Sequence, residues 1–313
     1  MLIAIDHGNY AIKTSDGDSF VSGLSEHSVQ PPLVTDTISW DGKYWTLTEN
    51  RIPVMRDKTK DDRFFVLSLF AIARELNKRG EPPFKADIEL AVGLPPEHYS
   101  VLKEEFADYF KREKVKFKYN GTPICLNILR VFVYPQAYAA IIPRSRLLMS
   151  TPRLFVIDLG GFTTDVLMMR NGKPDLQICR SLEIGVITLN NDIIGKVSAL
   201  HDMRIEDDHI TAVIQGRETI LPESVIQTIW DSTRRHSEMI LNKLRELHVD
   251  LRSTPAVFIG GGSIQFRKYI EESQMVVKAD FIADPNANAV GYKMLAAAQL
   301  QNHSVSVRNN GNA

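Results

Sequence analysis

The sequence predicts a two-lobed α/β protein in which each lobe has a mixed β-sheet flanked by helices. Apolar, β-branched stretches alternate with segments whose apolar residues recur at helical spacing. One strand-and-turn unit also occurs twice, at the N-terminus and again about half a chain length later, which suggests two similar lobes sharing a cleft. We expect the first lobe over residues 1–150, with an outer subdomain within about 30–120, and the second over residues 151–300.

The strand-and-turn unit is clearest in residues 154–169. An apolar, β-branched run leads into an acidic, glycine-containing and threonine-containing turn, and a second apolar run follows. Glycines let main-chain N–H groups approach an anion, and a carboxylate at a strand end can hold hydrated Mg²⁺. Taken alone, the stretch fits a phosphate-binding hairpin and an ordinary β-hairpin equally well. The residues that would supply this chemistry are Asp158, Gly160, Gly161, Thr163 and Asp165.

The first copy of the unit lies in residues 2–13. A β-branched strand again ends in an acidic residue, Asp6, with Gly8 and Asn9 close behind it. From the following strand, Lys13 could reach a β- or γ-phosphate, or it could be a solvated lysine on an edge strand. Two such turns would allow one nucleotide to be held from both sides.

A third glycine-rich segment follows the short apolar run 256–259. Its residues Gly260, Gly261, Gly262 and Ser263 place a strand end, an accessible main chain and a helix start in succession. The absence of side chains would let a ribose and an α-phosphate lie against the backbone. A triple glycine alone is weak evidence for a ligand, but its place after the two turns strengthens the interpretation.

These segments together resemble the actin, sugar-kinase and heat-shock-chaperone ATPase superfamily. The resemblance is most specific to the ParM/StbA group of plasmid-segregating actin-like proteins, and rests on residues 5–13, 92–95, 158–165 and 256–263, which occur in the family's order. It implies an actin-like ATPase fold with a nucleotide cleft between two lobes. It also implies ATP, or GTP, with Mg²⁺ as cofactors.

The resemblance implies roles for individual residues. Asp6 and Asp158 would hold hydrated Mg²⁺ and help to arrange the attacking water, while Asp165 would steady the second hairpin or the outer shell of the ion. Gln136, at the start of the connecting helix, would orient that water. The phosphate contacts would come from Gly8, Asn9, Lys13, Gly160, Gly161 and Thr163, and the nucleoside contacts from Gly260, Gly261, Gly262 and Ser263.

Some positions match the resemblance less well. Gly185 occupies a place where related proteins have a glycine near the nucleotide, although a sharp structural turn is an equal alternative. Phe162 replaces a threonine and would remove one hydroxyl donor from the second turn. His7 stands where an acid is frequent, and Gln136 replaces a frequent glutamate. These departures leave nucleotide binding in place and bear on the rate of hydrolysis.

The function implied is that of a nucleotide-dependent, filament-forming ATPase that segregates plasmid DNA in the bacterial cytoplasm. Its partners would be other copies of itself and a DNA-binding adaptor protein. Two alternatives remain: a non-hydrolysing actin-like scaffold and a small-molecule kinase of the same superfamily. We find no convincing sugar-binding segment for the kinase.

Composition excludes other classes of protein. The 313 residues suffice for two domains, and contents of 44% hydrophobic and 24% charged residues are ordinary for a globular protein. Two cysteines argue against a disulfide framework, and a formal net charge of −1 gives no electrostatic case for direct nucleic-acid binding. No signal-peptide pattern and no apolar run near the ~18 residues of a membrane span is present, so we expect no membrane association.

Several further elements follow from periodicity and composition. Helices are predicted over 64–79, 98–111 and 222–247. The basic and aromatic residues of 111–118 fit an edge-protecting strand better than a nucleic-acid patch. The polar residues from Gln301 onwards predict a disordered tail.

Overall fold

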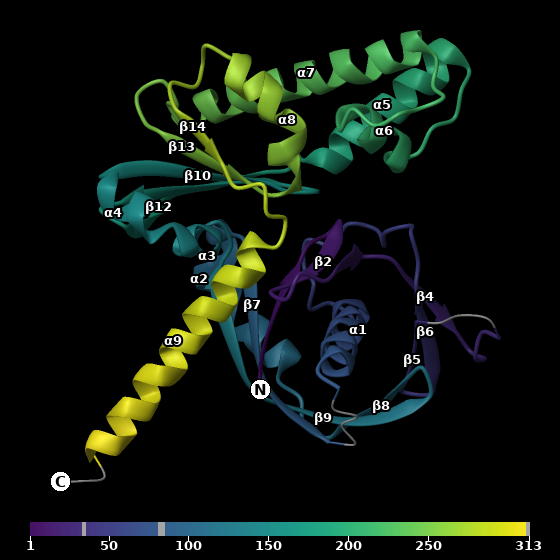
Figure 1. Cartoon of the computed structure of the whole chain (residues 1–313), viewed down its shortest axis with the longest axis vertical. Helices are drawn as coiled ribbons and strands as arrows, with labels where there is room; N and C mark the ends of the chain where they lie inside the picture. The colour runs from purple at the N-terminus through teal and green to yellow at the C-terminus, as the bar shows by residue number, and fades with distance from the viewer. Residues whose placement is uncertain (33–35, 81–84, 311–313) are drawn as a thin grey trace. The chain divides into compact units, whose positions relative to one another are not determined.

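A computed structural model describes residues 1–32, 36–80 and 85–310, and the chain divides into two units. Unit 1 comprises Met1–Arg144 and Asn286–Ala313, and unit 2 comprises Ser145–Pro285 (Figure 1). The first boundary therefore comes slightly before the expected residue 150. The C-terminal segment departs from the expectation altogether, because it returns to unit 1 instead of completing the second lobe.

Unit 1 is built on a mixed sheet with the strand order β3-β2-β1-β7-β9-β8-β5-β6-β4 among the described residues. Strands β1, β7 and β9 run parallel to one another, and the other pairings are antiparallel. The strand bounds are β1 (Leu2–His7), β2 (Ala11–Thr14), β3 (Ser19–Val21), β4 (Leu24–His27), β5 (Thr37–Trp40), β6 (Lys43–Leu47), β7 (Ala86–Leu94), β8 (Val115–Tyr119) and β9 (Thr122–Pro135).

The sheet of unit 1 curls around helix α1 (Arg63–Lys78), as Figure 1 shows. Residues 64–73 of α1 are buried without interruption, as expected of a helix that is enclosed on all sides. Helices α2 (Pro96–Phe110) and α3 (Tyr138–Ile141) complete this part of the unit. The predicted helices over 64–79 and 98–111 are thus confirmed within two residues at each end.

The C-terminal helix α9 (Ala287–Asn310) packs on β1, β7 and α3. Small residues make this contact possible: a Cβ atom on Gly291 would lie 1.9 Å from the Ala139 carbonyl oxygen, and one on Gly93 would lie 2.0 Å from the hydroxyl of the buried Tyr292. The helix continues through Asn310, over residues for which the sequence favours a disordered tail, and residues 311–313 lie outside the described part. Once packing has formed the first turns, each further residue adds a helical hydrogen bond at little cost.

Unit 2 contains a mixed sheet with the order β12-β11-β10-β13-β14 in the described chain. Helices α5 to α8 lie on one side of this sheet (Figure 1). The elements are α4 (Ser145–Ser150), β10 (Arg153–Leu159), β11 (Thr164–Arg170), β12 (Lys173–Leu182), α5 (Val186–His201), α6 (Asp207–Ile214), α7 (Glu223–Glu246), β13 (Ala256–Ile259), α8 (Gly261–Glu272) and β14 (Ala279–Phe281). The hairpin predicted over 154–169 and the long helix predicted over 222–247 are both confirmed.

Strand β8 is not the edge strand that its alternating lysines predict. It lies between β9 and β5 in the sheet order. Its pairing with β5 is short, however, because only Tyr119 and Lys118 have partners there, Ile38 and Ser39. Alternation along a strand identifies its exposed face, but it does not reveal whether a neighbouring strand is present.

Candidate functional site

The first acidic turn joins β1 to β2 in unit 1. The Gly8 N–H donates to the carbonyl oxygen of Ala11 at 3.1 Å, and a Cβ atom on Gly8 would lie only 2.7 Å from that oxygen. Glycine is therefore required for the chain to close this turn. The turn holds Asp6 at the end of a central parallel strand.

Three of the predicted site residues come together at this turn. The ends of the parallel strands β1 and β9 lie at the same edge of the sheet, which places Asp6 beside Gln136. Gln136 Nε2 donates to Asp6 Oδ1 at 3.0 Å, and both side chains are buried. Lys13 Nζ lies 3.8 Å from Asp6 Oδ2. An acid, an amide and an ammonium group thus form one cluster.

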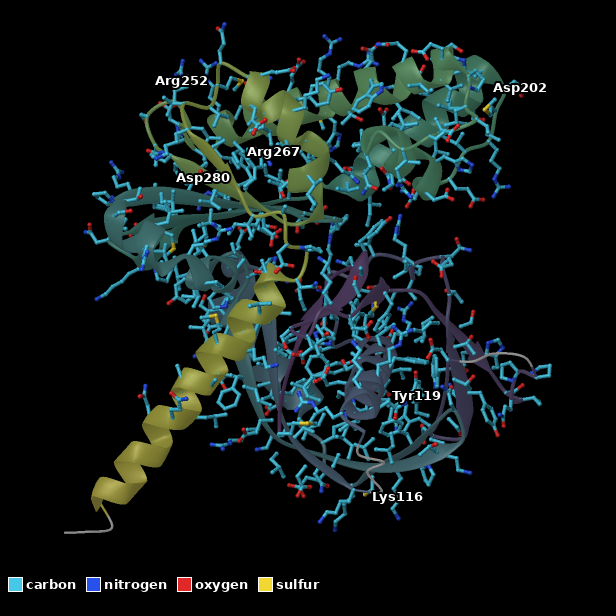
Figure 2. The ribbon with its side chains drawn as sticks, in the orientation of Figure 1. Lys116, Tyr119, Asp202, Arg252, Arg267 and Asp280 are labelled. Atoms are coloured by element: carbon cyan, nitrogen blue, oxygen red, sulfur yellow. The ribbon has the colours of Figure 1, made fainter. Side chains whose placement is uncertain are left out.

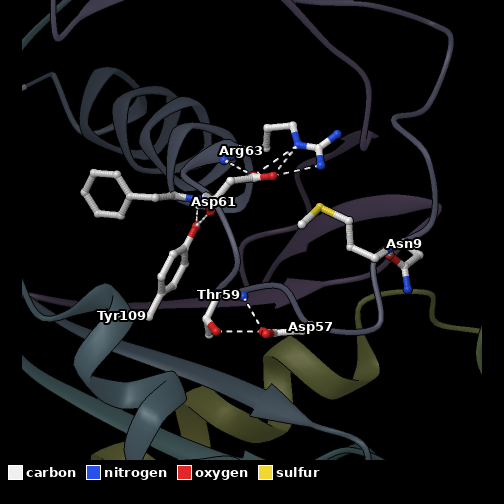
Figure 3. A network of polar contacts seen from close by, with 8 residues as sticks. Asn9, Asp57, Thr59, Asp61, Arg63 and Tyr109 are labelled. Atoms are coloured by element: carbon white, nitrogen blue, oxygen red, sulfur yellow. Dashed lines mark hydrogen bonds and ion pairs between the residues drawn. The ribbon is translucent and has the colours of Figure 1, made fainter.

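The long segment between β6 and α1 passes beside the first turn (Figure 3). The Met55 N–H donates to the side-chain oxygen of Asn9 at 3.1 Å, and the Lys58 ammonium donates to the His7 carbonyl. Further along, the Tyr109 hydroxyl donates to the Asp61 carbonyl at 2.8 Å. Asn9 is therefore held in place by this segment through its side-chain oxygen.

His7 points away from the predicted phosphate side. Alternation along β1 sends Asp6 and His7 to opposite faces, and the His7 ring packs among those of Phe64, Phe106 and Phe110. Its Nε2 lies 2.7 Å from the Ser68 hydroxyl. Burial, with the Lys58 charge as a smaller contribution, lowers the pKa of His7 to about 3. His7 is a neutral core residue, so its replacement of an acid does not alter the turn's ligand chemistry directly.

The second acidic turn joins β10 to β11 in unit 2. The Gly160 N–H donates to the Thr163 carbonyl at 2.9 Å. The Thr163 hydroxyl donates to Asp165 Oδ2 at 2.8 Å, so Asp165 steadies the hairpin, one of its two expected roles. The Thr164 hydroxyl, which the sequence did not single out, donates to the Ile184 carbonyl at 2.6 Å and ties the turn to the segment before α5.

Gly185 fixes the second turn against helix α5. The first N–H groups of α5, from Val186 and Ile187, donate to the carbonyls of Gly160 and Gly161 at 3.1 and 2.8 Å. A Cβ atom on Gly185 would lie 2.6 Å from the Gly161 oxygen. Both carbonyls of the turn are thus used by the helix, which leaves the main-chain N–H side of the turn to face an anion.

The glycine run approaches the same turn from β13. Strands β10 and β13 are parallel neighbours with Asp158 paired to Ile259, so Gly260 follows directly beside Asp158. Gly260 has φ +82°, and a Cβ atom there would lie 2.3 Å from Asp158 Oδ1. Gly262 packs on Leu159 and is buried, whereas Gly261 is exposed. The Ser263 hydroxyl donates to the Gly260 carbonyl at 2.7 Å, within the first turn of α8.

Unit 2 thus brings Asp158, the glycines of the turn, Gly185 and the glycine run together. His236 of α7 also lies at this group, although no pattern in the sequence indicated it. Its ring lies near the Gly185 main chain and stacks on Phe266 with ring centroids 5.6 Å apart. Helical periodicity places His236 on the buried face of α7, but no local pattern indicates its partner.

Two models of known protein families match the chain. The model of the N-terminal domain of actin-like proteins matches residues 4–138. The C-terminal model of the archaeal MreB-like actin homologue matches residues 156–272. The chain belongs to the actin-like proteins. The resemblance stated from the sequence is confirmed at this level, and no curated protein sequence matches.

Solved structures with this fold extend over nearly the whole actin-like chain. The archaeal actin homologue Ta0583 is 19% identical, with 95% of this chain and 99% of that chain covered and a TM-score of 0.75; it has also been solved in complex with ADP. The actin-like protein Alp7A is 14% identical, with 99% and 100% covered and a TM-score of 0.77. A 15-stranded ParM filament from Clostridium botulinum is 19% identical, with 95% and 99% covered and a TM-score of 0.73. The predicted actin-like ATPase fold is confirmed.

Neither a metal-ligand cluster nor a membrane-spanning helix is found among the described residues of this actin-like chain. Within residues 1–32, 36–80 and 85–310, no group of three or more histidine, cysteine or acidic side chains is arranged to hold a metal ion. None of the helices in the same ranges combines the length and the hydrophobicity of a membrane span.

The buried histidines of this actin-like chain predict acid sensitivity. Burial lowers the pKa of His236 to about 4 and that of His7 to about 3, whereas an unfolded histidine titrates near 6.5. The unfolded state therefore takes up more protons as pH falls below about 6.5, and stability is lost in that direction. Between about pH 7 and pH 5, each histidine should lower the free energy of unfolding by about 2 kcal/mol.

Urea unfolding at the two pH values measures this loss. The His7→Phe variant, which preserves the aromatic packing, should reduce the difference between them, while His98→Phe at an exposed position should not. An unchanged difference in His7→Phe would show that His7 is protonated in the folded state.

Proposed function

We propose that the chain binds ATP with Mg²⁺ at the two acidic turns, hydrolyses it, and assembles into filaments under the control of the bound nucleotide. The observation that carries this proposal is a repeated local structure. Each unit has a buried aspartate at the end of a central strand, followed by a glycine turn and an antiparallel strand. We infer that both turns act on the same triphosphate.

In unit 1 the cluster around Asp6 would activate water. The Nε2 group of Gln136 donates a hydrogen bond to Asp6, and this bond fixes the orientation of the amide. The amide oxygen of Gln136 would then accept a hydrogen bond from water. An amide is too weak a base to remove a proton, but phosphoryl transfer depends chiefly on placing the nucleophile in line with phosphorus. Lys13, beside Asp6, would neutralise β- and γ-phosphate charge. Gly8 and Asn9 would supply further contacts.

In unit 2 the Gly161 N–H would bind phosphate oxygens, while Gly160, whose N–H is bonded to the Thr163 carbonyl, would let the main chain come close to them. The carbonyls on the other side are held by α5, so the turn presents donors in a fixed geometry. Thr163 already donates to Asp165, and its part would be to keep the turn rigid. The nucleoside would lie along the glycine run, where Gly260 and Gly261 keep accessible main chain, and the buried Gly185, Gly262 and Ser263 would shape the backbone behind them.

The donor set fits Mg²⁺. Asp6 and Asp158 are buried carboxylates at strand ends, and Mg²⁺ usually takes only one or two protein carboxylates, keeping several waters and binding the phosphates of the substrate. A cluster of three protein ligands is therefore not required. When bound, the ion would neutralise charge on the phosphates, with Asp165 available to its outer shell.

Filament formation is supported by the relatives. The ParM of Clostridium botulinum and Alp12 are both known as filaments. We propose that this chain also polymerises with itself in the bacterial cytoplasm, and that a DNA-binding adaptor protein connects the filament to plasmid DNA. The net charge of −1 supports an adaptor in place of direct DNA contact.

Light scattering and phosphate release, recorded together, test this function. Purified protein is mixed with ATP, GTP, ADP or no nucleotide in the presence of Mg²⁺. Scattering that rises with ATP and decays as phosphate is released supports the proposal. Scattering without phosphate release would favour a non-hydrolysing scaffold, and ATP consumption only after a metabolite is added would favour a small-molecule kinase.

The role of Gln136 makes a separate prediction. Gln136→Ala removes the group that orients water and should lower phosphate release about 100-fold, because misplacing a reacting group typically has this effect. ATP affinity, measured by titration calorimetry, should change little. Gln136→Glu should retain more activity than Gln136→Ala. Equal activity of wild type and Gln136→Ala would show that Gln136 does not act on the water.

A further inference from the structure

A groove of about 400 Å³ lies on the surface of unit 1, apart from the acidic turn. It is surrounded by the turn of the β5–β6 hairpin and by strands β8 and β9. The side chains that bear on its chemistry are Trp40, Asp41, Lys116, Lys118, Pro123 and Cys125. Figure 2 shows Lys116 on the outer side of the curved sheet, opposite to the side that Tyr119 and α1 occupy.

The groove exists because β5 and β8 separate. They are paired only at Ile38–Tyr119 and Ser39–Lys118. Beyond this point β5 turns back into β6 through Asp41 and Gly42, both with positive φ, while β8 continues along β9 to Val115. Among the described residues, Lys116 and Phe117 therefore have β9 on one side and no strand on the β5 side.

Uncompensated positive charge lines the open edge. Lys116 and Lys118 are both exposed, and no ion pair engages either side chain in the described part of the chain. By contrast, two other basic residues of unit 1 are paired, Arg112 with Asp62 at 2.7 Å and Lys43 with Glu26 at 2.9 Å. Asp41 is the one acidic residue among the described residues that line the groove.

We propose that this groove binds an extended acidic segment of a partner protein, which pairs with the open edge of β8 and places carboxylates on Lys116 and Lys118. Residues two apart on a strand are about 6.7 Å apart and project to the same face, so alternate acidic residues of an added strand would match the two lysines. The residues between them would project to the other face of the strand, towards Trp40, which lines the groove and packs on Phe65.

The proposal is independent of the nucleotide chemistry, and fluorescence anisotropy with the full chain tests it. The probe is a short labelled peptide in which glutamate and threonine alternate. It should bind, and added salt should weaken the binding. A peptide of the same charge with prolines replacing two threonines should lose the binding, because proline cannot donate to the strand ladder. The double variant Lys116→Glu/Lys118→Glu should bind at least about tenfold more weakly.

The double variant Lys60→Glu/Lys103→Glu is the matched control, since it makes the same charge change at exposed positions away from the groove. It should bind the peptide as wild type does. Thermal unfolding establishes whether each variant is folded.

A footprint on wild-type protein keeps the test decisive if a variant fails to fold. Cys125 is half-buried in the lining of the groove, and Cys179 is buried in unit 2. The peptide should slow the alkylation of Cys125 by iodoacetamide and leave Cys179 unaffected. No protection of Cys125 at millimolar peptide would overturn the proposal. The two lysines would then serve only to prevent pairing with another strand. Binding of a labelled DNA duplex that depends on Lys116 and Lys118, in place of peptide binding, would also overturn it.

Discussion

Replacing Asp158 by alanine should lower phosphate release from ATP by about 100- to 1,000-fold, the usual effect of removing a group that stabilises charge at a reacting phosphate or acyl centre. Asp158 is buried at the end of β10 and lies against the main chain of Gly260. The other acid of this hairpin, Asp165, is paired opposite Asp158 and accepts the Thr163 hydroxyl, so we expect it to replace the lost charge only in part. Steady-state phosphate release measures the effect.

The control for this prediction is Asp280→Ala, which removes an exposed carboxylate from β14 of the same sheet. Both variants should remain folded by circular dichroism, because alanine fills a strand position without strain. Turnover at the wild-type rate from Asp158→Ala would remove this carboxylate from the mechanism.

Replacing Gly185 by alanine should lower the free energy of unfolding by about 2–3 kcal/mol, within the range for overpacking a well-packed site. The added methyl group would lie 2.6 Å from the Gly161 oxygen and 2.7 Å from the Gly160 oxygen. It would push the turn away from α5 and break the hydrogen bonds that fix the turn. Nucleotide affinity should fall with stability, because the phosphate donors would no longer be held in one geometry.

Helix α5 also contains the matched control. Gly195 is exposed in the interior of the same helix, and a Cβ atom there meets no atom within 4 Å. Gly195→Ala should raise the free energy of unfolding by about 0.5–1 kcal/mol, because alanine favours helix more than glycine does. Urea unfolding of the two variants gives the comparison. If both substitutions changed stability by the same amount and sign, the contact between Gly185 and the turn would not be as the structure shows it.

Local patterns were sufficient to predict both acidic turns. Each turn follows a β-branched strand that ends in aspartate and is closed by a glycine, and both signals lie within a dozen residues. The expectation for Gln136 rested on the family resemblance, and its position beside Asp6 follows from the parallel strands β1 and β9, which end at one edge of the sheet. His7 could have been placed in the core by alternation alone.

Other features depend on contacts between distant segments. The return of α9 to unit 1 depends on Gly93 and Gly291, which leave room for Tyr292 and for the Ala139 main chain. The residues next to these two glycines in the sequence do not distinguish them from other glycines of the chain. The position of His236 beside Gly185 also brings together residues far apart in sequence. The position of β8 inside the sheet likewise depends on a partner strand that its own residues do not specify.

A crystal structure with Mg²⁺ and a non-hydrolysable ATP analogue tests the central claim most directly. We expect one nucleotide whose β- and γ-phosphates contact the turn after Asp6 and the turn after Asp158 at the same time, with the metal beside both carboxylates. A nucleotide bound by one turn alone, or bound elsewhere on the chain, would contradict it.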